Sequence, residues 1–312
     1  MPVRTHSIGR HQTHNRWNNQ LTPVLAIESG DIVEFDCHDA SGGQVKPGMS
    51  AVEYATIDRN WIHTINGPVF VKGAQPGDTL EINVLKLEHN GWGWTSLVPG
   101  LGSLPERFKD PFLFHWQLDG NRSVSLPPAT VQVSPFLGIM GVAPAEAGEF
   151  RTRPPGPFGG NLDVRQLVQG TKLFLPVFNE GALFSTGDGH AAQGDGEVCI
   201  NAIEAPLRAT VQLTVRKGLK IDQPFAEVPS VPPLAPERGA WAFIASAEQP
   251  MDAARNVIHH AIDFLMAKFS LSAEHAYVLC SVALDLKISQ CVNVPMITVT
   301  GLLAKNLFPP SD

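Results

Sequence analysis

The sequence predicts a mainly β protein, in which a β-sandwich, jelly-roll-like core precedes a smaller C-terminal α+β part. The first observation is composition, because 28 Gly and 26 Pro in 312 residues suit many short strands joined by turns. The second is a Pro-rich connector at residues 224–236, after which a helical periodicity replaces short strand-like runs. We therefore expect a core at residues 1–223, which carries the functional site, and a C-terminal part at residues 224–312.

The N-terminal part of the core alternates short β-like runs with turn residues. Gly30-Asp31 and Gly77-Asp78 each precede such a run, which suggests antiparallel hairpins of a sandwich around them. Residues 89–160 are less regular, and loops of this length usually carry function or subunit contacts. The expected strands of the core are residues 24–27, 32–35, 68–72, 79–85, 173–177, 182–185, 197–202 and 208–215.

The C-terminal part contains the clearest helix of the sequence. Apolar residues from Ala254 to Phe269 follow the spacing of one helix face, which predicts a helix over residues 251–269. Ser272 is a suitable N-cap for a second helix that reaches Leu284. Residues 294–299 are then expected to return as a strand.

Charge and cysteine content restrict the partners. The formal net charge is −7 and no Lys/Arg cluster exceeds a pair, which argues against nucleic-acid and anionic-membrane binding. The four cysteines are far apart, as in a protein of the reducing cytoplasm, and no run is apolar enough for a membrane span. We expect a cytoplasmic protein with a small substrate that is not strongly anionic.

The strongest candidate site is the segment 185–197, where polar side chains alternate with glycines between two apolar runs. Asp188, His190 and Glu197 could hold a divalent metal with an open position for water. The competing interpretation is a hairpin loop whose carboxylates only bond nearby N–H groups.

Three further groups are weaker candidates. Asp39 ends the segment 36–39 behind an expected strand, and it could add a ligand or a base. Asn161 and Asp163 lie two apart and could bind an amide, although a helix-capping role is equally consistent. His63 lies in an apolar run, where histidines are more often packed in the core.

No Gly-x-Ser-x-Gly motif is present for a serine nucleophile. Cys199 lies in an expected strand, with its thiol facing the core, and Cys280 lies on the second expected helix. Cysteine or carboxylate nucleophilic catalysis therefore stays an open alternative.

Four blocks of the sequence form a further pattern: Pro68–Asp78, Pro135–Glu146, Pro155–Asp163 and Gly181–Glu197. In this order they resemble the acetamidase/formamidase family, and the resemblance covers roughly residues 14 to 305. The resemblance implies hydrolysis of a short linear amide such as formamide or acetamide to ammonia and a carboxylate, a jelly-roll-like core and a homo-oligomer. Phe158 stands where many relatives have His, which could alter the pocket wall.

The resemblance also implies a divalent metal, with zinc favoured and calcium as the alternative. The matching positions that could bind the ion are Asp188, His190 and Glu197, with Asp39 and His63 as possible contributors. Our mechanistic hypothesis keeps Asp188 and His190 as metal ligands and makes Glu197, as general acid–base, and Asp163 the catalytic residues. In this hypothesis Asn161 and Trp94 contact the substrate. A non-catalytic β-sandwich with a structural calcium site is the alternative outside the enzymes.

Overall fold

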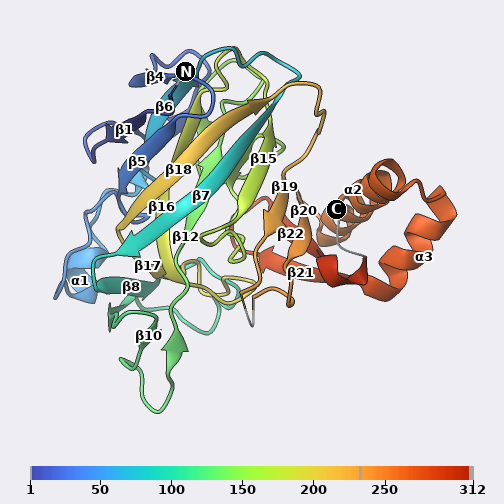
Figure 1. Ribbon diagram of the computed structural model, residues 1–312. Coiled ribbons are helices and arrows are strands. Elements are labelled where there is room, and N and C mark those ends of the chain that lie inside the picture. The colour runs from blue at the N-terminus through green and yellow to red at the C-terminus, as the bar shows by residue number, and fades with distance from the viewer. Residues whose placement is uncertain (1, 232–233, 309–312) are drawn as a thin grey trace.

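The computed structural model describes residues 2–231 and 234–308, and it confirms a mainly β architecture with a small helical part near the C-terminus (Figure 1). Most of the strands in these residues belong to two nine-stranded sheets. The first sheet has the order β1 (Thr5–Ile8), β5 (Ile32–Cys37), β18 (Leu207–Arg216), β7 (Thr79–His89), β15 (Lys172–Pro176), β19 (Phe225–Val228), β20 (Ala240–Ala247), β22 (Ile297–Ala304) and β21 (Leu284–Gln290).

The second sheet carries the segment with the candidate metal ligands. Its main path is β14 (Gly159–Asn161), β12 (Phe136–Gly141), β16 (Phe184–Ala192), β17 (Ile203–Glu204), β8 (Trp92–Leu97) and β9 (Phe112–Gln117). β6 (Ile65–Val71) pairs with β16 and also with β2 (Thr13–His14) and β4 (Leu25–Ile27). Two small ribbons are β10 (Arg122–Ser123) with β11 (Val131–Gln132), and β3 (Arg16–Trp17) with β13 (Phe150–Arg151).

The two sheets pack face to face around one large apolar core. In β18, Ala209, Val211 and Leu213 are buried and the residues between them are more exposed, as the period of two predicts. Phe35 of the first sheet meets Phe184 of the second edge to face, with ring centroids 6.1 Å apart. Burial of this apolar surface, worth about 25 cal/mol per Å², holds the sheets together.

Helices α2 (Pro250–Phe269) and α3 (Ala273–Ala283) form a layer beside the sandwich (Figure 1). The apolar stripe of α2 packs on β20 and β22 through Val257 and Leu265. Gly301 of β22 permits this close approach, because a Cβ there would lie 2.5 Å from Val257. The Ser272 side chain accepts a hydrogen bond from the His275 N–H and caps α3, as predicted.

The remaining helical pieces are short: α1 (Ala51–Tyr54), η1 (Arg59–Trp61) and η2 (Lys305–Leu307). The first sheet is continuous from β15 into β19, β20 and β22, so strands on both sides of residue 223 share one set of hydrogen bonds. The division into two parts at that residue stays a prediction.

Several local predictions were wrong. The Gly-Asp turns do not close hairpins, because β4 and β5, and likewise β6 and β7, lie in different sheets. Residues 89–160 contain the regular strands β8, β9 and β12, whereas residues 197–202 form no strand. The last strand is residues 297–304, rather than 294–299.

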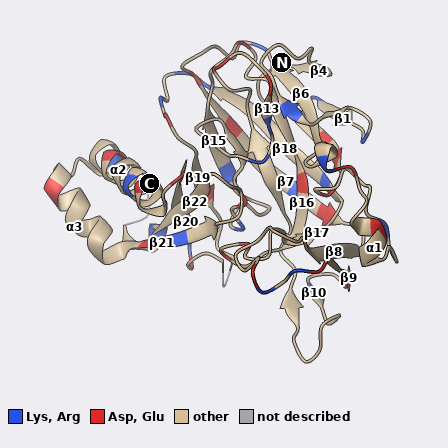
Figure 2. Cartoon of the chain, turned by 180° about the vertical axis from the view of Figure 1, so that it is seen from behind, with Lys and Arg blue, Asp and Glu red and all other residues tan. Residues whose placement is uncertain are grey.

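Among the described residues, no helix is both long and apolar enough to cross a membrane. Figure 2 shows basic and acidic residues interspersed along the elements of both sheets.

Candidate active site

A cavity of about 200 Å³ opens where β8, β14, β16 and β17 meet the loops that follow them. Its wall contains four carboxyl groups, a concentration of acid that no ordinary apolar core would accept. The four are Asp163, Asp188, Glu197 and Glu204, and all of them are buried.

β16 supplies the centre of the site, and every one of its residues is buried. Asp188 and His190 lie two apart in this strand, so their side chains reach the same region. The glycines between the polar residues serve close packing, since a Cβ on Gly189 would lie 2.2 Å from the Ala205 carbonyl oxygen. The hairpin predicted for 185–197 was therefore wrong: Asp188 and His190 lie in a strand, and only Glu197 lies in a loop.

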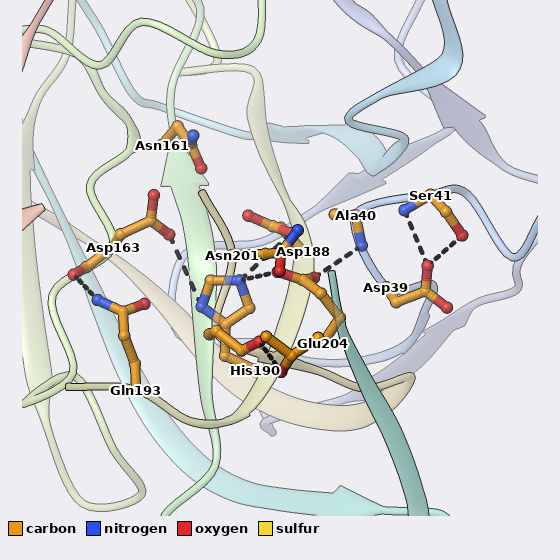
Figure 3. A network of polar contacts seen from close by, with 12 residues as sticks. Asp39, Ala40, Ser41, Asn161, Asp163, Asp188, His190, Gln193, Asn201 and Glu204 are labelled. Atoms are coloured by element: carbon orange, nitrogen blue, oxygen red, sulfur yellow. Dashed lines mark hydrogen bonds and ion pairs between the residues drawn. The ribbon is translucent and has the colours of Figure 1, made fainter. Parts of the chain in front are cut away.

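The His190 ring contacts carboxylates through both of its nitrogens (Figure 3). Its Nε2 lies 3.1 Å from Glu204 Oε1 and 3.5 Å from Asp188 Oδ1. Its Nδ1 lies 3.7 Å from Asp163 Oδ1. The Phe136 ring packs edge to face on the imidazole, with ring centroids 5.0 Å apart, and fixes its position.

Amide side chains hold Asp163 in place. Asn293 Nδ2 donates to Asp163 Oδ2 at 2.6 Å, and Gln193 Nε2 donates to the Asp163 carbonyl oxygen at 2.8 Å. Asp163 has a φ of +48°, so the chain turns sharply after Asn161 and the two do not continue one extended strand. Both nevertheless line the cavity.

Burial and mutual repulsion dominate the electrostatics. Burial raises the pKa of Asp163 and of Glu204 to about 7, and it raises the pKa of Glu197 well above its usual range, with Asp163 adding repulsion. Burial disfavours a charged His190, but Glu204 and Asp188 outweigh it and raise the imidazole pKa. Burial also disfavours the charged Asp188, but His190 and His63 outweigh it and lower the carboxyl pKa.

The residues fit a divalent cation. Two groups of three bring an imidazole nitrogen and two carboxylate oxygens within 4.8 Å of one another: Asp188, His190 and Glu204, and Asp163, His190 and Glu197. Four buried ligand atoms have no hydrogen-bond partner among residues 2–231 and 234–308: Asp163 Oδ1, Asp188 Oδ1, His190 Nδ1 and Glu197 Oε2. A cation would satisfy such atoms, and this mixture of oxygen and imidazole donors suits zinc.

Comparison with known proteins identifies the family of this chain. The model of the acetamidase/formamidase family matches residues 4–149 and 145–309. The chain belongs to the acetamidase/formamidase family. Membership supports amide hydrolysis as the activity.

Individual relatives of the acetamidase/formamidase family match along most of the chain. A formamidase of Methylophilus methylotrophus is 25% identical, over 95% of this chain and 89% of that protein. An acetamidase of Mycolicibacterium smegmatis is 26% identical, over 59% of this chain and 61% of that protein. The crystal structure of an acetamidase from Bacillus halodurans is 32% identical and superposes with a TM-score of 0.88, covering 97% of this chain and 98% of that one.

The cavity and the cluster around His190 contain most of the residues that the sequence indicated. Trp94 and His63 line the cavity, although Trp94 lies on strand β8 rather than in a loop. Asp39 is not part of either group of possible ligands, since its carboxylate accepts bonds from the Ser41 N–H and hydroxyl (Figure 3). The sequence analysis missed Glu204, whose one signal is a carboxylate inside the apolar run 202–205.

The prediction for Cys199 was wrong. This residue lies outside the strands, is half-buried and lines two hollows beside the cavity, rather than facing the core from a strand. Burial raises the pKa of its thiol, which leaves less of the reactive thiolate at neutral pH.

Proposed function

We propose that this member of the acetamidase/formamidase family hydrolyses the carbon–nitrogen bond of a short amide with the help of a divalent cation. The buried cluster of four carboxyl groups around His190 carries the proposal, because several of its ligand atoms have no hydrogen-bond partner within the part of the chain that the structure describes. Family membership supports the reaction class, and formamide and acetamide are the substrates to test first.

Asp188, His190 and Glu204 would hold the cation, since all three are buried and their ligand atoms already lie close together. When bound, zinc supplies Lewis acidity, which polarises an amide carbonyl and makes water a better nucleophile near neutral pH.

Glu197 is the acid–base residue of the proposal. Its Oε2 is buried without a partner, and the residue lines the cavity. Positive charge introduced among the carboxylates would lower its raised pKa, so that the carboxylate can accept a proton from water and return it to the departing nitrogen. General acid–base catalysis of this kind contributes about 10²- to 10⁴-fold.

Asn161 and Asp163 would orient the substrate. The Asn161 Oδ1 has no partner and can accept a hydrogen bond from an amide NH₂, and Asp163 Oδ1 can accept a second. Trp94 forms an apolar part of the wall and limits the length of the acyl group. Such walls are needed because one methylene alone discriminates by only about 1–3 kcal/mol.

Ammonia release from formamide, acetamide and propionamide tests the proposal. We expect Glu197→Gln to lower kcat by at least about 10²-fold. Asp195→Asn, a matched change two residues earlier in the same loop, should retain most activity. If the wild-type protein releases no ammonia from any small amide, the proposal is wrong.

Chelation followed by reconstitution tests the cation separately. Activity should vanish in a metal-free sample and return with zinc. Full activity without metal would reject cation assistance, and calcium-induced stabilisation without turnover would favour the non-catalytic module.

Loss of turnover in Cys199→Ala would favour a thiol nucleophile instead. A cytoplasmic location and self-association stay predictions.

A further inference from the structure

The wall of the cavity also carries positive charge that the proposed reaction does not use. Arg59, at the start of η1, and Arg153, just after β13, both line it. Arg59 is exposed and Arg153 is half-buried, so the pair lies towards the open side of the cavity. Two guanidinium groups beside a small-amide site need a physical reason.

Neither arginine has a carboxylate partner among the described residues. Arg59 donates to the Tyr54 hydroxyl at 3.0 Å and to the Tyr54 carbonyl oxygen at 3.2 Å, and its guanidinium lies over the Tyr54 ring, 4.4 Å from the centroid. Arg153 has no side-chain hydrogen bond or ion pair within the described part of the chain, in contrast to Arg216, which pairs with Glu81. The Tyr54 contacts hold Arg59 in one orientation and leave donors free.

The arrangement favours an anion between the two arginines. Burial lowers the pKa of Arg153, repulsion from Arg151 and Arg59 adds to this effect, and attraction to Glu197 only partly opposes it. A partly desolvated cation without a partner is costly, and a bound carboxylate would offset that cost. Guanidinium groups match the two oxygens of a carboxylate in geometry as well as in charge.

The size of the cavity agrees. A volume of about 200 Å³ equals several water molecules at about 30 Å³ each, whereas formamide has only three non-hydrogen atoms. The space therefore accommodates a second functional group beyond the amide.

We propose, on the basis of the amide hydrolysis argued above, that the substrate is a short amide that also carries a carboxylate. The carboxylate binds Arg153 and Arg59, while the amide lies beside Asn161 and the carboxyl cluster. In the reaction, the water oxygen bonds to the amide carbon, the carbon–nitrogen bond breaks, and the nitrogen leaves as ammonia with a proton from water. The product is a dicarboxylate. The net charge of −7 predicts a substrate that is not strongly anionic, whereas this proposal adds one carboxylate that lies beside the two arginines.

Succinamate and butyramide, which have similar length and differ in charge, provide the test. We expect kcat/KM for succinamate to exceed that for butyramide by about tenfold or more, because hydrogen bonds to charged groups contribute about 1.5–3 kcal/mol. Arg153→Gln should lower this ratio about 10- to 100-fold, mainly through KM for succinamate. Arg153→Lys should restore part of it, and the control Arg122→Gln, an exposed arginine outside the cavity wall, should leave the ratio unchanged.

Two results would overturn the proposal. The first is a wild-type protein that prefers butyramide. The second is a folded Arg153→Gln protein with an unchanged ratio of kcat/KM for succinamate to kcat/KM for butyramide, because Arg153 would then only neutralise the carboxyl cluster. Succinate binding, measured by calorimetry, tests the anion subsite separately from the proposed amide hydrolysis. If no amide is hydrolysed but succinate binds in an Arg153-dependent way, the anion subsite stands and the proposed function fails. If succinate does not bind, the anion subsite fails as well.

Discussion

His190 of β16 and Glu204 of β17 lie directly opposite each other in the antiparallel ladder. Opposite residues in such a pair have Cβ atoms about 4.5–5.5 Å apart, so the backbone itself brings the imidazole Nε2 within 3.1 Å of Glu204 Oε1. Glu204 is in turn the register partner of Trp94 on β8. The proposed ligands His190 and Glu204 and the wall residue Trp94 thus lie side by side on three neighbouring strands. Strand pairing, rather than a loop, therefore fixes their geometry.

Glu204→Gln should separate stability from function. The variant keeps the size of the side chain but removes a negative charge, so we expect it to lose bound zinc and at least about 10²-fold of the activity. Compared in metal-free samples, its melting temperature should be unchanged or higher, because burial raises the Glu204 pKa to about 7 and a neutral amide avoids that desolvation cost.

Metal analysis and calorimetry of Glu204→Gln, beside the exposed control Glu34→Gln, check this expectation. A variant that unfolds more easily yet keeps its zinc and activity would show that Glu204 is structural.

Sequence patterns predicted the fold class and many residues of the site, but they did not predict which strands belong to which sheet. The apolar stripe of residues 251–269 is a local property, and it predicted α2 almost to the residue. Gly30-Asp31 and Gly77-Asp78 also revealed where the chain turns. A local pattern cannot specify which sheet receives the next strand, and both turns lead into the opposite sheet.

The same reason explains the errors within the site. Glycines around Asp188 and His190 suggested a loop, because glycine favours turns when nothing packs against it. Here neighbouring parts of the chain pack closely against the strand, and a Cβ on Gly187 or Gly189 would lie within 3.1 Å of their atoms. Glu204 contacts His190 only through the pairing of β16 with β17, so no spacing in the sequence marks it as a partner.

Zinc binding should release protons and weaken on acidification. Burial raises the pKa of the ligand Glu204 to about 7, and although burial opposes it, Glu204 and Asp188 raise the pKa of the ligand His190. Both groups must lose a proton before they bind a cation. Affinity should therefore be greatest above pH 7 and fall as the pH drops through 7, by up to about tenfold per pH unit for each proton released. Titration calorimetry at pH 6.5 in two buffers of different ionisation enthalpy measures the number of protons, and identical heats in both buffers would contradict the expectation.

Gly138→Ala, a change in strand β12, should displace the side chains of the site. A Cβ at Gly138 would lie 2.5 Å from Asp163 Oδ1, 2.7 Å from Asp188 Oδ2 and 2.9 Å from His190 Cε1. One methyl group would thus displace three site residues, and we expect zinc affinity to fall about 10- to 100-fold and the free energy of unfolding to fall by about 1–3 kcal/mol.

Gly194→Ala is the matched control, because no atom lies within 4 Å of a Cβ at that position. Zinc titration and urea unfolding of both variants provide the measurement. Equal zinc affinity in Gly138→Ala and the wild type would show that the site tolerates such a displacement.

His14 should make stability depend on pH outside the carboxyl cluster. Its ring nitrogens contact the Arg16 carbonyl oxygen and the Ser185 hydroxyl, each at 2.8 Å, and burial lowers its pKa from 6.5 to about 4. Between these values the unfolded chain binds a proton that the folded chain does not, so the folded state loses stability as the pH falls from about 6.5 to about 4. The loss contributed by His14 amounts to about 3 kcal/mol at most.

His14→Gln should remove this contribution. At pH 7.5 the variant should be less stable than the wild type, because it loses two hydrogen bonds of about 1 kcal/mol each. Since only the wild type then loses stability through this site on acidification, the difference in unfolding free energy should narrow towards pH 4.5 and can reverse in sign. Urea unfolding at several pH values measures it, and the exposed His11→Gln provides the control, with a pH dependence that should follow the wild type. The prediction is wrong if the difference in unfolding free energy between His14→Gln and the wild type stays constant from pH 7.5 to 4.5. The His14 ring would then take up its proton as readily in the folded chain as in the unfolded chain.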